Sequence, residues 1–273
     1  GKGYAILSSS TISNIALKIK NILYGILILI TAGVVGIILN FEKIQNEYDW
    51  LTLRPEQKLN VPLERQLPDL PNGCEVTSLS MLLNYYDINA KEFVEGTLNV
   101  DFKATQDKFI NKLPDKGYIL DFGCGSGRDT KYFLAKDFNV DAIDGSIELC
   151  KIASEYTKIK VRHMYFNELS VVNKYDGIWA CSSILHLSLD DLVDVFKRMS
   201  KALKDEGIIY TSFKYGDFSG ERNGRYFTDM TEDSFAKLIA NVDNLKVEEQ
   251  WITADVRPQR GNEKWLNLIL RKK

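Results

Sequence analysis

The strongest chemical signals in the chain are a glycine-rich run and an acidic residue downstream of it. The run Asp121-Phe122-Gly123-Cys124-Gly125-Ser126-Gly127 follows a short apolar segment. Glycines at alternating positions allow a tight turn that brings bare backbone against a ligand, and the amides of the following helix can bind the ligand's polar groups. A second apolar segment ends in Asp144, at the distance where a carboxylate accepts hydrogen bonds from both hydroxyls of a ribose. Because Arg128 stands where a nicotinamide fingerprint needs glycine, the pattern favours a nucleoside ligand without a pyrophosphate.

The elements that must position these residues form a regular alternation of strand and helix patterns from residue 117 onward. Residues 119–122 and 140–143 are short and apolar, as buried parallel strands are. Ser188 precedes two acidic residues and predicts a helix start, with the helix extending to Lys204 before Gly207 begins a new strand. Residues 246–253 and 264–271 predict an antiparallel hairpin. This order predicts an α/β fold, a Rossmann-like parallel sheet with helices on both faces.

Three segments resemble the successive motifs of class I S-adenosylmethionine-dependent methyltransferases, namely ILDFGCGSGRDT, AIDGS and YDGIWACSSILHL. The similarity covers residues 85–273 and is closest to the small bacterial enzymes of the tellurite-resistance and quinone-pathway type. It implies a seven-stranded methyltransferase sheet, S-adenosyl-L-methionine as the cofactor, and methyl transfer to a small-molecule acceptor. The sulfonium is an activated donor, so the protein mainly has to align an acceptor lone pair with the methyl carbon.

The resemblance also implies a set of cofactor-binding residues. Asp121, Gly123 and Gly125 would line the methionine end, and Asp144 would bind the ribose. Phe166 and Asn167 follow the third strand, where the family often has an acidic residue beside the adenine; the amide oxygen of Asn167 could still accept that hydrogen bond. The predicted cofactor site comprises Asp121, Gly123, Cys124, Gly125, Gly127, Asp144, Gly145, Phe166, Asn167 and Cys181.

Several of these residues have simpler interpretations. Asp144 could cap the turn into the next helix, and Cys124 and Cys150 could be small packing residues, since free cysteine is commonly buried. His186 is a candidate general base, but a histidine in this loop is more often a structural or cofactor-proximal group. No other catalytic residue is predicted.

The clues to the acceptor lie in residues 211–231, which we interpret as a long loop rich in glycine, aromatic and charged residues, as lids and binding loops are. Arg222, Arg225 and Tyr226 belong to this segment, and Arg257 and Arg260 to the connection of the last hairpin. These arginines could bind an anionic acceptor. They could equally face solvent and pair with neighbouring acidic residues, Glu221, Asp229 and Asp255. Tyr85, Tyr86 and Phe93 could form an aromatic lid over the sulfonium.

The N-terminal part of the chain carries a different signal. Residues 22–39 hold no charge and are long enough to cross a hydrocarbon core of about 30 Å. Lys2, Lys18 and Lys20 precede them, so the charge bias favours an uncleaved signal-anchor helix with a cytoplasmic N-terminus. A buried core helix and a cleaved signal peptide are the alternatives.

Residues 61–86 resemble the opening of a papain-like cysteine peptidase of the C39-like family, carried by the run PNGCEVTSL. Cys74 would be its nucleophile, at a helix start that favours the thiolate. Such a nucleophile needs a histidine base, and both histidines of the chain lie in the methyltransferase-like part. A membrane-anchored cysteine hydrolase is therefore the alternative function, and we expect it to be inactive.

These patterns predict three parts: residues 1–40 with the transmembrane helix, 41–84 with a linker and the peptidase fragment, and 85–273 with the methyltransferase domain. The net charge of 35 minus 37, or -2, gives no broad attraction for nucleic acid. The cysteines and histidines lack zinc spacings, so no metal is expected. The charge bias sends residues after 40 outward, yet S-adenosylmethionine is made in the cytoplasm. We expect a single-pass membrane protein whose methyltransferase domain functions in the cytoplasm.

Overall fold

The computed structural model describes residues 85–222, 225–257 and 260–273. The chain divides into two units at Leu67, and every described residue belongs to the second, Pro68–Lys273. The predicted membrane helix at 22–39 and the proposed nucleophile Cys74 lie outside the described residues, so both stay predictions. Within the described ranges, no helix is both long and apolar enough to cross a membrane.

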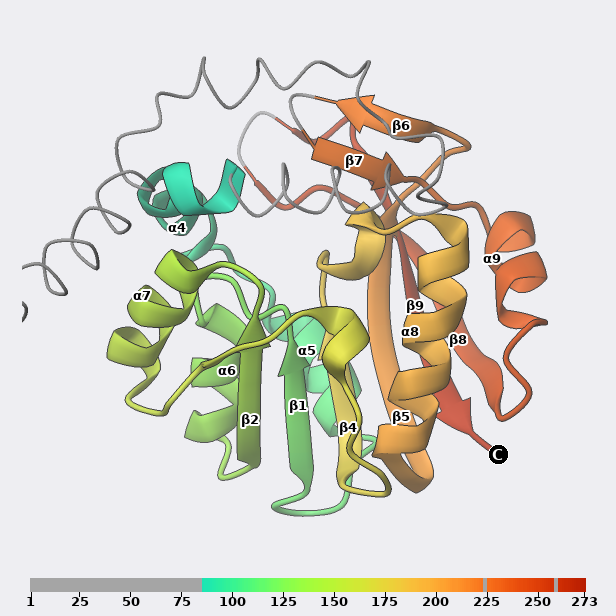
Figure 1. The fold of residues 1–273 in the computed structure, drawn as a ribbon, viewed down its shortest axis with the longest axis horizontal. Coiled ribbons are helices and arrows are strands. Elements are labelled where there is room, and N and C mark those ends of the chain that lie inside the picture. Colours follow the sequence, from blue (N-terminus) through green and yellow to red (C-terminus); the bar gives the residue numbers. More distant parts are fainter. Residues whose placement is uncertain (1–84, 223–224, 258–259) are drawn as a thin grey trace, which may run out of the picture. The chain divides into compact units, whose positions relative to one another are not determined.

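One seven-stranded sheet forms the centre of the described part, in the order β3-β2-β1-β4-β5-β9-β8 (Figure 1). The first five strands are parallel, and β9 runs antiparallel to both of its neighbours. The predicted seven-stranded, Rossmann-like fold and its closing hairpin are therefore confirmed. The strands are β1 (Tyr118–Phe122), β2 (Asn139–Asp144), β3 (Arg162–His163), β4 (Tyr175–Ala180), β5 (Leu203–Lys214), β8 (Leu245–Ala254) and β9 (Lys264–Lys272).

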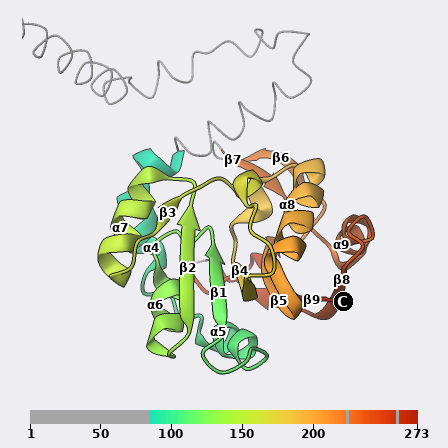
Figure 2. The same ribbon diagram turned by 60° about the horizontal axis from the view of Figure 1, so that its bottom comes forward.

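Helices pack on both faces of this sheet. One face carries α5 (Lys103–Ile110), α6 (Arg128–Ala135) and α7 (Ile147–Thr157), and the other carries α8 (Leu189–Ala202) and α9 (Glu232–Ile239). Helix α4 (Ala90–Thr97) and a small hairpin of β6 (Ser219–Arg222) and β7 (Arg225–Thr228) lie at the same end of the sheet in both views (Figures 1 and 2). Two short 3₁₀ turns, η2 (Phe166–Glu168) and η3 (Ile184–His186), complete that end.

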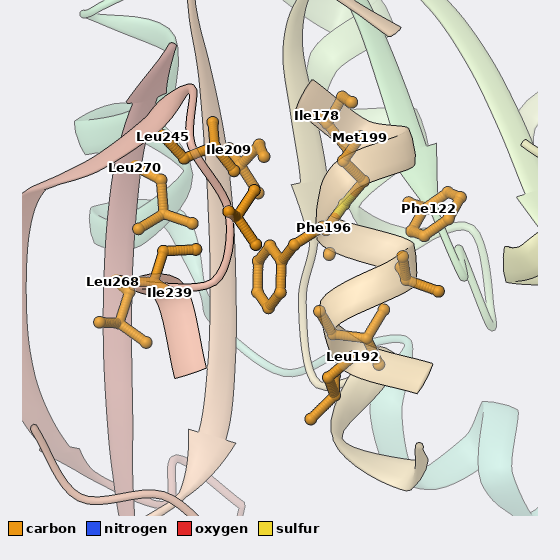
Figure 3. Close-up of a cluster of buried hydrophobic side chains, with 14 of the residues drawn as sticks. Phe122, Ile178, Leu192, Phe196, Met199, Ile209, Ile239, Leu245, Leu268 and Leu270 are labelled. Carbon is orange, nitrogen blue, oxygen red and sulfur yellow. The ribbon is translucent and has the colours of Figure 1, made fainter. Parts of the chain in front are cut away.

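The core follows from the alternation of side chains along buried strands. In β1, Leu120 and Phe122 join the cluster under α8 and α9, whereas Ile119 joins the cluster under α5 and α6. All three are fully buried, as expected for a central strand covered on both faces. Phe196 and Met199 of α8 point toward the sheet (Figure 3).

One predicted helix boundary was wrong. The helix expected to reach Lys204 ends at Ala202, because Leu203 already pairs with Tyr175 of β4 and begins β5. Ser188 caps its start as predicted, its hydroxyl accepting the Asp191 amide hydrogen at 3.2 Å.

The segment expected to be one long loop is instead largely strand. It contains the end of β5 and the β6–β7 hairpin, in which Arg222 and Arg225 are paired across the strands. Both arginines therefore lie on strands rather than in a loop, and cross-strand hydrogen bonds fix their backbone.

The packing of α8 gives a direct test of the core. Replacing Phe196, which is fully buried, by alanine should lower the free energy of unfolding by about 3–5 kcal/mol, because the cavity left behind cannot collapse completely. Leu189 begins the same helix and is 52% exposed, so Leu189→Ala should change it by no more than about 0.5 kcal/mol. Urea unfolding followed by near-UV circular dichroism measures both. Equal losses in the two variants would contradict the packing.

Candidate functional site

A cavity of about 420 Å³ opens at the carboxyl ends of β1, β2, β4 and β5. Its volume falls within the roughly 300–1,000 Å³ of small-molecule sites. The glycine-rich loop after β1 lines one end, and the arginines of β6, β7 and the β8–β9 connection line the other. Open α/β sheets bind ligands at this edge, and most of the predicted cofactor and acceptor residues meet in this one cavity.

The loop after β1 needs its glycines for two reasons. Gly123 and Gly125 have φ angles of +86° and +53°, which side chains rarely adopt. A Cβ on Gly123 would lie 2.5 Å from the Cβ of Ser183, and one on Gly125 would lie 2.9 Å from the ring of Phe93. Backbone therefore faces the cavity at both positions, as the glycine pattern predicted.

Asp144 ends β2 and lines the cavity beside this loop. Its carboxylate accepts the backbone amide hydrogen of Gly125 at 2.8 Å and that of Ser146 at 2.9 Å. Burial raises its pKa, and the two amide hydrogen bonds act in the opposite direction. The capping interpretation is thus correct, and it is compatible with ribose binding because each carboxylate oxygen can accept a second hydrogen bond.

Most of the other predicted cofactor residues also line the cavity: Cys124, Gly145, Phe166 and Cys181. Three do not. Asp121 lies beneath the loop, where its carboxylate accepts the Thr130 hydroxyl at 2.5 Å. Burial and the nearby charge of Asp129 raise its pKa to about 8.

The other two residues outside the lining are Gly127 and Asn167. Gly127 is the N-cap residue of α6, where an added Cβ would lie 2.8 Å from Thr157 of α7. Asn167 is exposed on η2, while its neighbour Phe166 faces the cavity between Phe122 and the loop. Of the two residues predicted beside the adenine, Phe166 lines the cavity and Asn167 does not, because the 3₁₀ turn points consecutive residues in different directions.

Asp129 is a cavity residue that the sequence analysis missed. Its carboxylate accepts hydrogen bonds from Gln106 Nε2 at 2.6 Å, from Trp179 Nε1 at 2.8 Å and from the guanidinium of Arg128 at 2.8 Å. Arg128 also lines the cavity. The signal available in the sequence was an acidic residue in the first turn of the helix after the glycine loop.

The cysteines of this region behave as packing residues. Cys124 and Cys150 are buried and free, as predicted. Burial raises the pKa of Cys181 to about 12, so its thiol is neutral where it lines the cavity.

The predicted arginines converge at the other end of the cavity. Arg222, Arg225, Arg257 and Arg260 all line it, but Tyr226 does not. The alternative of local pairing holds for two of them. Arg222 forms an ion pair with Asp229, and Arg257 binds both oxygens of Asp255 at 2.9 and 2.5 Å. Burial opposes ionisation of Asp255, but the hydrogen bonds from Arg257 hold its pKa at about 2.

His186 is buried on η3 and has both ring nitrogens engaged. Nδ1 donates to the backbone oxygen of Tyr226 at 2.6 Å, which leaves Nε2 to accept the Tyr86 hydroxyl at 3.0 Å. Burial lowers the pKa of His186 to about 4, so the imidazole is neutral near pH 7. Its lone pair points at Tyr86, which favours the structural interpretation over a general base.

Aromatic rings lie between the glycine loop and Arg225. Tyr86 and Phe93 both line it, with ring centroids 5.2 Å apart in an edge-to-face arrangement. Tyr85 instead packs against Arg225, whose guanidinium carbon lies 4.6 Å from its ring centroid. Phe93 rests over Gly125, so the aromatic wall begins at the glycine loop.

Residues 119–207 match the family model described as a methyltransferase domain. A protein of Staphylococcus carnosus described as an uncharacterized methyltransferase is 26% identical over 192 residues, 64% of this chain and 92% of that protein. The N-terminal Xaa-Pro-Lys N-methyltransferase 1 of Xenopus tropicalis is 39% identical over 127 residues, 41% of this chain and 56% of that protein.

Among solved structures, the 1,6-didemethyltoxoflavin-N1-methyltransferase of Burkholderia thailandensis has the same fold, with a TM-score of 0.60 and 21% identity over 75% of this chain and 91% of that one. That enzyme was solved with S-adenosylhomocysteine and 1,6-didemethyltoxoflavin bound. The domain match, the relatives and the fold confirm the predicted enzyme class, an S-adenosylmethionine-dependent methyltransferase.

The buried neutral His186 predicts a pH dependence of stability. The pKa of His186 is about 4 in the folded chain and about 6.5 in the unfolded chain. Its contribution to the free energy of unfolding is therefore complete above pH 6.5 and is lost as the pH falls toward 4. The stability advantage of the wild type over His186→Gln should therefore shrink by about 2 kcal/mol between pH 7 and pH 4.5. Urea unfolding at both pH values measures it. A constant advantage would show that the imidazole titrates normally in the folded chain.

Proposed function

We propose that this protein transfers the methyl group of S-adenosylmethionine to a small-molecule acceptor held in the same cavity. The observation that carries the proposal is the continuity of that cavity. The glycine loop and Asp144 line one end, the arginines and aromatic rings line the other, and the whole has the volume of a small-molecule site.

The residues at the loop end fit a nucleoside with an amino-acid tail. Gly123 and Gly125 both line this end, and the lack of a Cβ lets Ser183 and Phe93 pack directly against their backbone. Asp144 offers its remaining lone pairs to ribose hydroxyls, and Phe166 offers a ring face to the adenine. Arg128 lines the same end and is held by Asp129, which leaves its charge largely compensated.

The cofactor supplies a methyl group on a sulfonium, which needs no protein nucleophile. The work of this chain is then alignment and exclusion of water. Tyr86 and Phe93 present aromatic faces that attract a cationic sulfonium. His186 does not act as a base in this scheme, because its free lone pair already accepts the Tyr86 hydroxyl.

The arginine end supports an acceptor with anionic character, as the sequence suggested. We also propose that the domain functions in the cytoplasm, where the cofactor is made, and that residues 22–39 attach the chain to a membrane. The alternative of a cysteine hydrolase gains no support, since His163 and His186 are both engaged by partners within the described part of the chain.

The ribose role of Asp144 can be tested by binding alone. Asp144→Ala should weaken S-adenosylhomocysteine binding at least about tenfold, because charge-assisted hydrogen bonds to the hydroxyls are worth about 1.5–3 kcal/mol each. Asp144→Asn keeps the shape and should give a smaller loss. Glu155→Ala, an exposed acidic position on α7, should leave affinity unchanged. Isothermal titration calorimetry measures all three, and unchanged affinity in both Asp144 variants would rule out the assignment.

The acceptor class can be tested by following the methyl group. The full chain, incubated with methyl-labelled S-adenosylmethionine and a metabolite extract, should place label in small molecules. A peptide beginning Xaa-Pro-Lys, the sequence named for the Xenopus relative, should take up none. Label in the peptide but not in the extract would favour a protein acceptor instead.

A further inference from the structure

The cationic side chains at the acceptor end of the cavity are not equivalent. Arg222, Arg257 and Lys214 each form an ion pair, with Asp229, Asp255 and Glu263 respectively. Those three charges are compensated within the protein.

Arg225 is different. Within 85–222, 225–257 and 260–273 no carboxylate lies in ion-pair distance of it. Arg260 also lacks an ion pair in these ranges, but it is exposed, whereas Arg225 is half-buried. Arg225 is therefore the one cavity arginine in the described structure that is both sheltered and uncompensated.

The guanidinium of Arg225 has donors to spare. Its Nη1 donates to the Tyr86 hydroxyl at 3.3 Å, a long hydrogen bond. Its Nε is buried and has no hydrogen-bond partner among the described residues. An unpaired buried donor is costly, and a charged one more so. A ligand that brings a hydrogen-bond acceptor to this guanidinium would offset the free-energy cost of the unpaired donor.

Aromatic rings hold this guanidinium in place. Its central carbon lies 4.6 Å from the ring centroid of Tyr85, 5.8 Å from that of Tyr86 and 5.2 Å from that of Phe227. Such rings fix the planar group without neutralising it, and they limit the rotational freedom that binding would otherwise cost.

We propose that Arg225 binds a carboxylate of the acceptor, which makes the acceptor a small, flat carboxylic acid; this assignment rests on the methyl transfer proposed above. A single uncompensated guanidinium matches the single charge of a carboxylate, and its fork of N–H groups matches the two oxygens. A phosphate monoester carries close to two charges at pH 7 and would require a second free cation at this depth.

The position of Arg225 places the carboxylate near the reacting end. Tyr86 contacts Arg225 on one side and Phe93 on the other, and Phe93 covers Gly125 of the cofactor loop. Tyr86 and Phe93, packed edge to face, thus span the distance from the guanidinium to the loop. A compact ring that lies along these two side chains could present its methyl-accepting atom toward the glycine loop while its carboxylate stays on Arg225.

The experiment uses the full chain saturated with S-adenosylhomocysteine and three probes that share one ring: benzoate, benzamide and phenyl phosphate. Titration calorimetry gives the affinity of each. The variants are Arg225→Gln, which removes the charge, and Arg225→Lys, which keeps the charge but loses the fork. The matched control is Arg198→Gln, on α8 outside the cavity lining.

We expect the wild type and Arg198→Gln to bind benzoate at least about tenfold more tightly than benzamide or phenyl phosphate. Arg225→Gln should lose this preference while binding S-adenosylhomocysteine as the wild type does, and Arg225→Lys should retain part of it. If Arg225→Gln fails to fold, the reduced preference of Arg225→Lys decides the matter.

Other outcomes would overturn the assignment. Equal binding of benzoate and benzamide, absence of benzoate binding, or a preference that survives in both Arg225 variants would each exclude a carboxylate on Arg225. Tighter binding of phenyl phosphate would replace the carboxylate by a phosphate. Failure of the wild type to bind S-adenosylhomocysteine would instead contradict the proposed function.

Discussion

The arrangement of the cavity depends on one buried carboxylate. Asp144 accepts the amide hydrogens of Gly125 and Ser146, so the end of β2 holds both the glycine loop and the start of α7. The Ser146 hydroxyl in turn donates at 2.5 Å to Asp87, which belongs to the helical residues 85–88. Through this chain of hydrogen bonds, the loop that would bind the cofactor and the aromatic wall beside it are positioned by the same group.

A second buried carboxylate stabilises the opposite side of the loop. Asp129 accepts hydrogen bonds from α5 through Gln106, from β4 through Trp179 and from its neighbour Arg128. Every oxygen of this charge is used, which is the condition under which a buried ion is tolerated. Trp179 also stacks on Tyr210 of β5 at a centroid distance of 4.0 Å. Asp129 is therefore connected through Trp179 to the core of the sheet.

The arginines at the acceptor end of the cavity differ in whether a carboxylate compensates their charge. Its arginines are contributed by β6, β7 and the β8–β9 connection, segments distant in sequence that meet only because the sheet order places β9 beside β5. Local acidic residues compensate Arg222 and Arg257, and Arg225 is left surrounded by rings. Selectivity for charge can therefore rest on a single side chain, even though the sequence shows a cluster of arginines.

The sequence by itself determined the sheet, the glycine loop and Asp144, because strand periodicity, glycine spacing and the acidic residue ending β2 are local signals. It could not place Asp121, whose side chain turns under the loop, or Asn167, which the 3₁₀ turn directs to solvent. It also missed Asp129, since its partners come from three separate elements. Which sheltered arginine stays uncompensated was decided by tertiary structure alone, because ion pairing depends on distances that cross-strand register and sheet order set.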